Sequence, residues 1–234
     1  MSLIGKARAH FENFGLWPQT RRVMKDRLTY LSVAKLKRIQ AAITETAHVP
    51  GDIVEFGVAL GGSGIILAHA ARGSEKKFHG FDVFGMIPEP TSDKDDLKSK
   101  QRYDVIKSGQ SEGIDGEEYY GYRSDLISDV RKSFYRHGAS VNDRDIILHK
   151  GLFEETWGVA SVECVSLVHI DCDWYDPVKF CLEKSAGVVS VGGNIIIDDY
   201  NDYGGCRIAV DEFVEVYRNF SLEMGPNPIL RRTA

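Results

Sequence analysis

Residues 165–173 read VSLVHIDCD, an apolar run rich in β-branched side chains that ends in two aspartates. Residues 192–199 read GGNIIIDD and repeat the pattern, with apolar side chains followed at once by two acids. Such runs are typical of strands buried on both faces of a parallel sheet. Because ligands bind beyond the carboxyl ends of such strands, the two stretches predict an α/β fold with four acids in one crevice.

The remaining elements are predicted from the periodicity of apolar residues. We expect further strands at residues 52–57, 79–84, 146–149 and 194–198. We expect helices within residues 1–50 and at 65–71, 124–138 and 206–220. The segments SLEM (221–224) and PILRR (228–232) predict a C-terminal antiparallel hairpin. Strands that alternate with helices imply one mostly parallel, doubly wound sheet.

The chain is expected to form a single domain over residues 1–234, because no repeat or second core is evident. Residues 1–50 form a predicted N-terminal helical arm, a candidate surface for homo-oligomer formation. Residues 85–138 form a long polar insert, predicted to be a helical lid. Its tyrosines at 119, 120 and 122 either clasp a ligand ring or face solvent. The DKDD run at 93–96 is expected to be a solvated loop.

Composition narrows the class of protein. The net charge is −5 and the pI is near 5.8, which argues against nucleic-acid binding. Apolar runs are far shorter than the ~20 residues that span a bilayer, so no membrane association is expected. The first residues lack the apolar core of a signal peptide. The four cysteines show no CxxC spacing, and a cytoplasmic location is the default expectation.

The four acids at the two strand ends are Asp171, Asp173, Asp198 and Asp199. Like charges this close repel each other, so a cation is expected among them, and a hard divalent ion with oxygen ligands is the simple answer. Alternation along a strand would turn Asp171 and Asp173 to the same side. The alternative for Asp198 and Asp199 is that they only cap a turn.

A glycine-rich segment, GVALGGSG at residues 57–64, follows the first strand and opens a helix. Its glycines allow a tight turn and close approach to a ligand. The spacing fits neither GxGxxG nor a P-loop, which disfavours an NAD-dependent dehydrogenase or a nucleoside triphosphate. Glu55 suits a ligand with an ammonium or sulfonium group, and Asp82 suits ribose hydroxyls. Together they suggest S-adenosylmethionine; the alternative is a purely structural turn.

Six stretches also carry a family resemblance, in one order along about residues 27–213. They are VPGDIVEFGVALGGS (49–63), HGFDVFGMIPEP (79–90), VRKSFYRHG (130–138), HKGLFEET (149–156), HIDCDWYDPVKFCLE (169–183) and GGNIIIDDYNDYGGCRIAVDEF (192–213). They resemble the macrocin O-methyltransferase family, the metal- and S-adenosylmethionine-dependent sugar O-methyltransferases of antibiotic biosynthesis.

The resemblance implies a Rossmann-like class I methyltransferase fold, bound Mg²⁺ and a mobile lid over a small-molecule glycoside or polyol in natural-product or polysaccharide biosynthesis. It implies Asp171, Asp198 and Asp199 as metal ligands and Asp173 as general base. The residues that it implies around the cofactor are Glu55, Phe56, Gly57, Val58, Gly61, Gly62, Ser63, Asp82, Gly151 and Leu152.

The chain also departs from the family pattern. The family commonly has Trp-Arg in the glycine turn, where this chain has Ala59–Leu60, and it has Thr156–Trp157–Gly158 where Thr-Leu/Met-Pro often occurs. These departures leave the acceptor open. A catechol-like aromatic diol is one alternative acceptor, and a non-catalytic binding module is another interpretation. Asp173 is alternatively a structural acid rather than a base.

Overall fold

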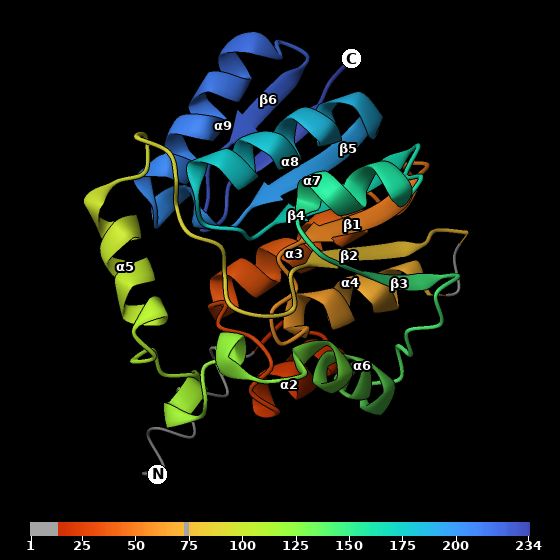
Figure 1. Ribbon diagram of the computed structural model, residues 1–234. Helices are drawn as coiled ribbons and strands as arrows, with labels where there is room; N and C mark the ends of the chain where they lie inside the picture. The colour runs from red at the N-terminus through yellow and green to blue at the C-terminus, as the bar shows by residue number, and fades with distance from the viewer. Residues whose placement is uncertain (1–13, 73–74) are drawn as a thin grey trace.

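The strands form one mixed sheet whose faces are both covered by helices (Figure 1). The computed structural model describes residues 14–72 and 75–234. The strand order is β3-β2-β1-β4-β5-β7-β6. The first five strands pair in parallel, whereas β7 is antiparallel to both β5 and β6. The predicted mostly parallel sheet and C-terminal hairpin are therefore confirmed.

The bounds of the elements follow the apolar runs of the sequence. The strands are β1 (Asp52–Phe56), β2 (Phe78–Asp82), β3 (Ile146–Lys150), β4 (Val165–Ile170), β5 (Val189–Ile197), β6 (Phe220–Glu223) and β7 (Ile229–Arg232). The α-helices are α2 (Pro18–Lys25), α3 (Val33–Glu45), α4 (Gly62–Ala71), α5 (Leu97–Lys107), α6 (Leu126–Arg136), α7 (Phe153–Thr156), α8 (Tyr175–Val188) and α9 (Gly204–Val216). Short 3₁₀ turns are η1 (Ile114–Gly116), η2 (Tyr120–Tyr122), η3 (Trp157–Val159) and η4 (Asp199–Asn201).

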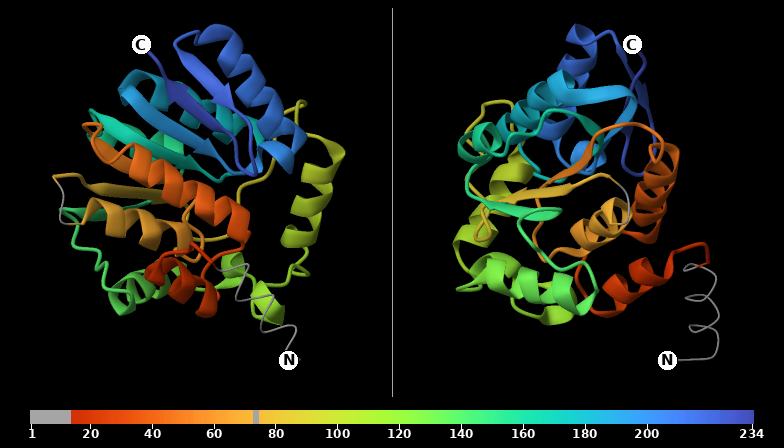
Figure 2. Two further views of the ribbon diagram at one scale, coloured as in Figure 1. Left: turned by 180° about the vertical axis from the view of Figure 1, so that it is seen from behind. Right: turned by 90° about the vertical axis from the view of Figure 1, so that its right-hand side faces the viewer.

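Successive side chains of the central strands enter two different cores. In β5, Ile196 belongs to the core shared with α3, α4 and α6, whereas Ile195 and Ile197 belong to the core shared with α8 and α9. This is the alternation expected of a strand, and here both faces are apolar because helices cover both. Figure 2 shows the helices on the two sides of the sheet.

The described part of the N-terminal arm packs into the protein's own core. Leu36 and Ile39 of α3 are completely buried, and α3 begins where the Ser32 hydroxyl accepts a hydrogen bond from Lys35 N. This helix therefore covers the sheet, and helices expected within residues 1–50 are present as α2 and α3. Residues 1–13, the rest of the predicted arm, lie outside the described residues.

The insert between β2 and β3 divides into two parts. Leu126, Val130 and Phe134 of α6 are buried against the sheet, so α6 is a crossover helix and the predicted lid ends before it. Figure 1 shows α5 at the flank of the molecule, outside the two helical layers. The helix predicted to reach Phe220 ends at Val216, because Phe220 pairs with Arg232 in the terminal hairpin.

Replacing Gly57 by alanine should lower the free energy of unfolding by at least about 3 kcal/mol. Gly57 has φ +90°, and a Cβ there would lie 1.8 Å from the backbone oxygen of Asp171. Urea denaturation would measure the loss. Gly85→Ala is the control, because no atom lies within 4 Å of its added Cβ. Equal stability of the two variants would show that β1 and β4 do not meet this closely.

Candidate active site

Two backbone hydrogen bonds extend the sheet ladder beyond its central strands. Asp171 N donates to Phe56 O at 2.9 Å, and Asp198 N donates to Ile170 O at 2.9 Å. The residues that follow β4 and β5 therefore stay in register with the neighbouring strand. This places Asp171 and Asp198 side by side at the carboxyl edge of the sheet, where the strand order reverses between β1 and β4.

Three carboxylates meet at this edge. One oxygen from each of Asp171, Asp198 and Asp199 lies within 4.8 Å of the other two. Burial, followed by the charge of Asp198, holds the pKa of Asp171 well above its usual range, and burial with the charge of Asp173 does the same for Asp199. Asp198 Oδ1 is buried and has no hydrogen-bond partner among the described residues. A close set of hard oxygen donors with an unused buried oxygen fits a divalent cation such as Mg²⁺.

Asp173 also lies at the acidic cluster, but it is in a turn after β4 and not in the strand itself. β4 ends at Ile170, and Asp173 lies in a turn with φ +59°. Its backbone N–H donates to Asp199 Oδ2 at 3.1 Å. Burial, followed by the charge of Asp198, raises the pKa of Asp173 to about 7. The expectation that Asp171 and Asp173 share a side because both lie on one strand is therefore wrong in its reason, although the two acids are neighbours at the same site.

Lys35 of α3 supplies positive charge to this acidic cluster, and sequence reasoning missed it. Its Nζ donates to Asp198 Oδ2 at 2.8 Å, to Asp198 O at 3.1 Å and to Asp202 Oδ2 at 2.9 Å. Burial opposes the charged form, but the charge of Asp198 and the hydrogen bonds to Asp198 and Asp202 together outweigh burial and raise the pKa of Lys35. The lysines of α3 all look alike in sequence, so no local signal distinguished this one.

A buried histidine lies between the glycine turn and the acids. His169 Nδ1 is 3.0 Å from Glu55 Oε1, and His169 Nε2 is 4.0 Å from Asp198 Oδ1. Burial favours the neutral ring, but the carboxylates of Asp198 and Glu55 outweigh it and raise the pKa of His169 to about 10. Glu55 Oε2 is buried without a partner among the described residues, 2.6 Å from the position that a Cβ on Gly64 would take.

The Asp82 carboxylate braces the glycine turn. Asp82 Oδ2 accepts hydrogen bonds from Val58 N at 2.8 Å and Ala59 N at 2.9 Å, and Oδ1 accepts one from Phe84 N at 2.6 Å. Three of about four acceptor positions are thus used within the protein. The backbone of Gly151 is held nearby, since its N–H donates to Asp82 O at 3.0 Å.

The other residues predicted around a cofactor divide into a buried group and an exposed one. Phe56 packs in the core against the rings of Phe81, Phe153 and Trp157. Leu152 is 42% exposed at the start of α7. The buried members that surround the turn are Val58, Gly62 and Ser63. Gly61 has φ +89°, and a Cβ there would lie 2.8 Å from the ring of Phe134.

The tyrosines of the insert form a packed cluster. Tyr119 is 3% exposed, and its ring lies 4.4 Å from that of Tyr120 and 5.1 Å from that of Tyr122. Burial, reinforced by the charge of Asp173, raises the pKa of Tyr119 to about 12. The guanidinium of Arg102 in α5 lies 5.7 Å from the Tyr119 ring. A fully solvated surface is therefore wrong for Tyr119, and the cluster lies close to Asp173.

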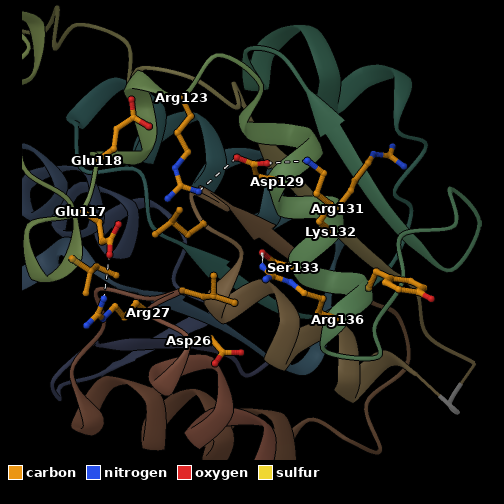
Figure 3. Close-up of a pocket in the computed structure, with 14 residues that line it drawn as sticks. Asp26, Arg27, Glu117, Glu118, Arg123, Asp129, Arg131, Lys132, Ser133 and Arg136 are labelled. Atoms are coloured by element: carbon orange, nitrogen blue, oxygen red, sulfur yellow. Dashed lines mark hydrogen bonds and ion pairs between the residues drawn. The ribbon is translucent and has the colours of Figure 1, made fainter.

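A hollow lined by α6, by residues 26–28 and by the insert is shown in Figure 3. It has a volume of about 830 Å³, and it touches the glycine turn at Leu60 but none of the four acids. Most of its charges are paired: Arg27 Nη1 lies 3.2 Å from Glu117 Oε1, and Arg123 Nη1 lies 3.7 Å from Asp129 Oδ2. We therefore place the candidate site at the acidic edge of the sheet and not in this hollow.

Comparisons with known proteins identify the family of the chain. The family model described as macrocin-O-methyltransferase (TylF) matches residues 17–220. Demethyldecarbamoylnovobiocin O-methyltransferase of Streptomyces niveus is 27% identical over 192 residues, which cover 79% of this chain and 67% of that protein. The 8-demethyl-8-(2,3-dimethoxy-alpha-L-rhamnosyl)-tetracenomycin-C 4'-O-methyltransferase of Streptomyces olivaceus is 27% identical over 190 residues, with the same coverage.

Solved structures share the fold. The structure of the O-methyltransferase NovP superposes with a TM-score of 0.73 at 22% identity, covering 88% of this chain and 83% of that one. The expected Rossmann-like class I methyltransferase fold is confirmed. Within residues 14–72 and 75–234, no helix combines the length and apolarity that crossing a bilayer requires.

Replacing Lys35 by methionine should lower the free energy of unfolding by about 2–3 kcal/mol, because Asp198 loses its cation in a mostly buried setting. Methionine keeps the apolar stem, so the loss reports the charge. Urea denaturation in the presence of a chelator would measure it. Lys37→Met, exposed on the same helix, should change stability by less than about 0.5 kcal/mol. A Lys35 variant as stable as the Lys37 variant would contradict the ion pair.

Proposed function

The chain belongs to the macrocin O-methyltransferase family, and from this premise we propose that it is an S-adenosylmethionine- and Mg²⁺-dependent enzyme that methylates a hydroxyl group of a sugar or glycoside. The observation that carries the proposal is the meeting of Asp171, Asp198 and Asp199 within 4.8 Å, next to the glycine turn. The α-L-rhamnosyl group in the name of the tetracenomycin relative supports a sugar acceptor.

Mg²⁺ would be held by Asp171, Asp198 and Asp199, whose oxygens fit its preference. When bound, the ion supplies positive charge beside the acceptor hydroxyl and lowers its pKa. Lys35 already pairs with Asp198 Oδ2, which limits the total negative charge of the site. Two vicinal hydroxyls of a sugar suit such a site, because they present two oxygens at once.

Asp173 is the proposed general base. Methyl transfer joins the methyl carbon to the acceptor oxygen, breaks the carbon–sulfur bond of the sulfonium, and leaves one proton on the oxygen to be removed. Asp173 takes that proton. Its pKa of about 7, raised by burial and then by the charge of Asp198, lies near neutral pH, where a base is both available and effective.

The methyl donor would lie over the glycine turn. Glu55 Oε2, buried beside Gly64 and without a partner among the described residues, supports a positively charged group at this end. Gly57, Gly61 and Gly151 have positive φ angles, which allow the backbone to turn tightly around this end of the sheet. The half-buried ring of Tyr120, which lies 4.4 Å from the buried ring of Tyr119, would offer aromatic surface to the acceptor ring near Asp173.

Replacing Asp199 by asparagine should weaken Mg²⁺ binding at least about tenfold, because one of three anionic ligands becomes neutral. Isothermal calorimetry of the ion, with S-adenosylhomocysteine present, would measure the change. Asp211→Asn, on the exposed face of α9, is the matched control and should bind Mg²⁺ as the wild type does. If the Asp199 variant bound Mg²⁺ with unchanged affinity, the proposed metal site would be wrong.

Replacing Asp173 by asparagine should lower kcat by about 10²–10⁴-fold, because the base is lost, while binding of S-adenosylhomocysteine stays intact. Transfer of a radiolabelled methyl group to a panel of glycosides, with and without Mg²⁺, would test both the activity and the base. If the wild-type enzyme methylated none of the glycosides, the proposed acceptor class would be contradicted. Normal turnover by the variant would leave the activity standing but reject Asp173 as the base.

A further inference from the structure

Two consecutive acids of the insert, expected to lie in a solvated loop, instead make contacts in the interior. Asp95 is only 4% exposed, and its Oδ1 accepts a hydrogen bond from Tyr175 N, the first residue of α8, at 2.9 Å. Asp96 Oδ2 accepts one from Gly204 N, the first residue of α9, at 2.8 Å. Asp96 Oδ1 accepts another from Ser99 N in α5, also at 2.8 Å. The pair therefore caps the amino ends of three helices.

The start of α9 is shaped to receive these carboxylates. A Cβ on Gly205 would lie 2.1 Å from Asp95 Oδ1, and a Cβ on Gly204 would lie 2.7 Å from Asp96 Oδ2. Two adjacent glycines thus leave the space that two adjacent aspartates fill. The φ angles of these glycines lie outside the left-handed region, so close packing rather than backbone conformation accounts for them.

Other contacts hold the insert against the same two helices. Trp174 Nε1 donates to Pro88 O at 2.9 Å, just before α8 begins. Lys94 Nζ donates to Tyr175 Oη of α8 at 2.8 Å and to Glu212 Oε1 of α9 at 2.6 Å. The segment from 88 to 96 therefore contacts both α8 and α9, through residues that precede the aspartate pair as well as through the pair itself.

Two of the three capped helices, α8 and α9, directly follow the acidic cluster in the chain. α8 begins two residues after Asp173, and α9 begins just after the η4 turn that opens with Asp199. The two loops also contact each other, since Asp173 N donates to Asp199 Oδ2 at 3.1 Å. Fixing both helix starts from one point of the insert therefore fixes the spacing between the loops that carry the carboxylates.

We propose that Asp95 and Asp96 are positioning residues of the methyl-transfer site, which hold the two carboxylate-bearing loops at the spacing that Mg²⁺ requires. The inference rests on the proposed function. Groups that orient metal ligands commonly change metal affinity by 10–100-fold when they are removed, because Mg²⁺ tolerates little distortion of its ligands. The insert is then a structural part of the site and more than a cover over it.

The test is Mn²⁺ binding to the full-length protein, followed by electron paramagnetic resonance, with Mn²⁺ as the probe for Mg²⁺. Asp95→Ala should raise the dissociation constant at least about tenfold. Asp95→Asn keeps an oxygen that accepts from Tyr175 N, so it should restore affinity to within about threefold of wild type. Asp96→Ala should weaken binding independently of Asp95. Circular dichroism would verify that each variant is folded.

Two controls separate positioning from a general loss of stability. Asp125→Ala removes another aspartate cap, whose Oδ1 accepts from Ser128 N at 3.4 Å at the start of α6, away from the site. Asp93→Ala removes an exposed acid of the same loop. Both should bind Mn²⁺ within about twofold of wild type. If Asp125→Ala weakened Mn²⁺ binding as much as Asp95→Ala does, the inference would be overturned.

A second variant covers the case in which Asp95→Ala does not fold. Gly205→Ala keeps both aspartates but pushes a methyl group into the place of Asp95 Oδ1, and it should weaken Mn²⁺ binding at least about tenfold. Folded Asp95 and Gly205 variants with wild-type affinity would overturn the inference and leave the proposed function intact. A wild-type protein that binds no Mn²⁺ would overturn the metal site and this inference together.

Discussion

Mutual repulsion among the carboxylates at the ends of β4 and β5 is the constraint on which the surrounding structure depends. Burial makes this repulsion costly, because little water screens the charges. The protein compensates from several directions at once. Lys35 pairs with Asp198 at 2.8 Å, His169 lies on the strand side of the cluster, and Asp173 N donates to Asp199. A divalent cation would neutralise the negative charge that these groups leave uncompensated.

This constraint bears on the placement of α3. α3 covers one face of the sheet through Leu36 and Ile39, and the same helix carries Lys35 to the acidic edge. Packing and charge therefore act on one element. A helix that only covered the sheet would not need a lysine at this position, and a free arm could not hold one there.

The sequence predicts the sheet and the acidic edge well because both depend on local patterns. The apolar runs before Asp171 and Asp198 determine where the strands end, and parallel pairing then brings those ends together. The glycine turn and the terminal hairpin are likewise encoded within short segments. The family motifs coincide with these segments, so resemblance and residue pattern point to the same residues.

The parts that sequence reasoning missed depend on partners distant in the chain. Lys35 meets an acid 163 residues away, and Asp96 caps a helix start 108 residues away. A polar loop such as DKDD has the same composition whether it faces water or caps buried helices. The side of Asp173 was also unpredictable by alternation, because the chain leaves the strand at Ile170 and turns through a positive φ.

Glycines were expected where the backbone must come close to another group, but the group that comes close belongs to the protein itself. Gly57 was expected to admit a ligand, yet its missing Cβ first admits the backbone oxygen of Asp171, and Gly205 in the same way admits the carboxylate of Asp95. Each contact joins a segment that bears a site acid to another part of the chain. Close packing at these glycines thus connects the turn, the acidic edge and the insert into one unit. A ligand bound at any of the three would meet a site whose geometry is set by all of them.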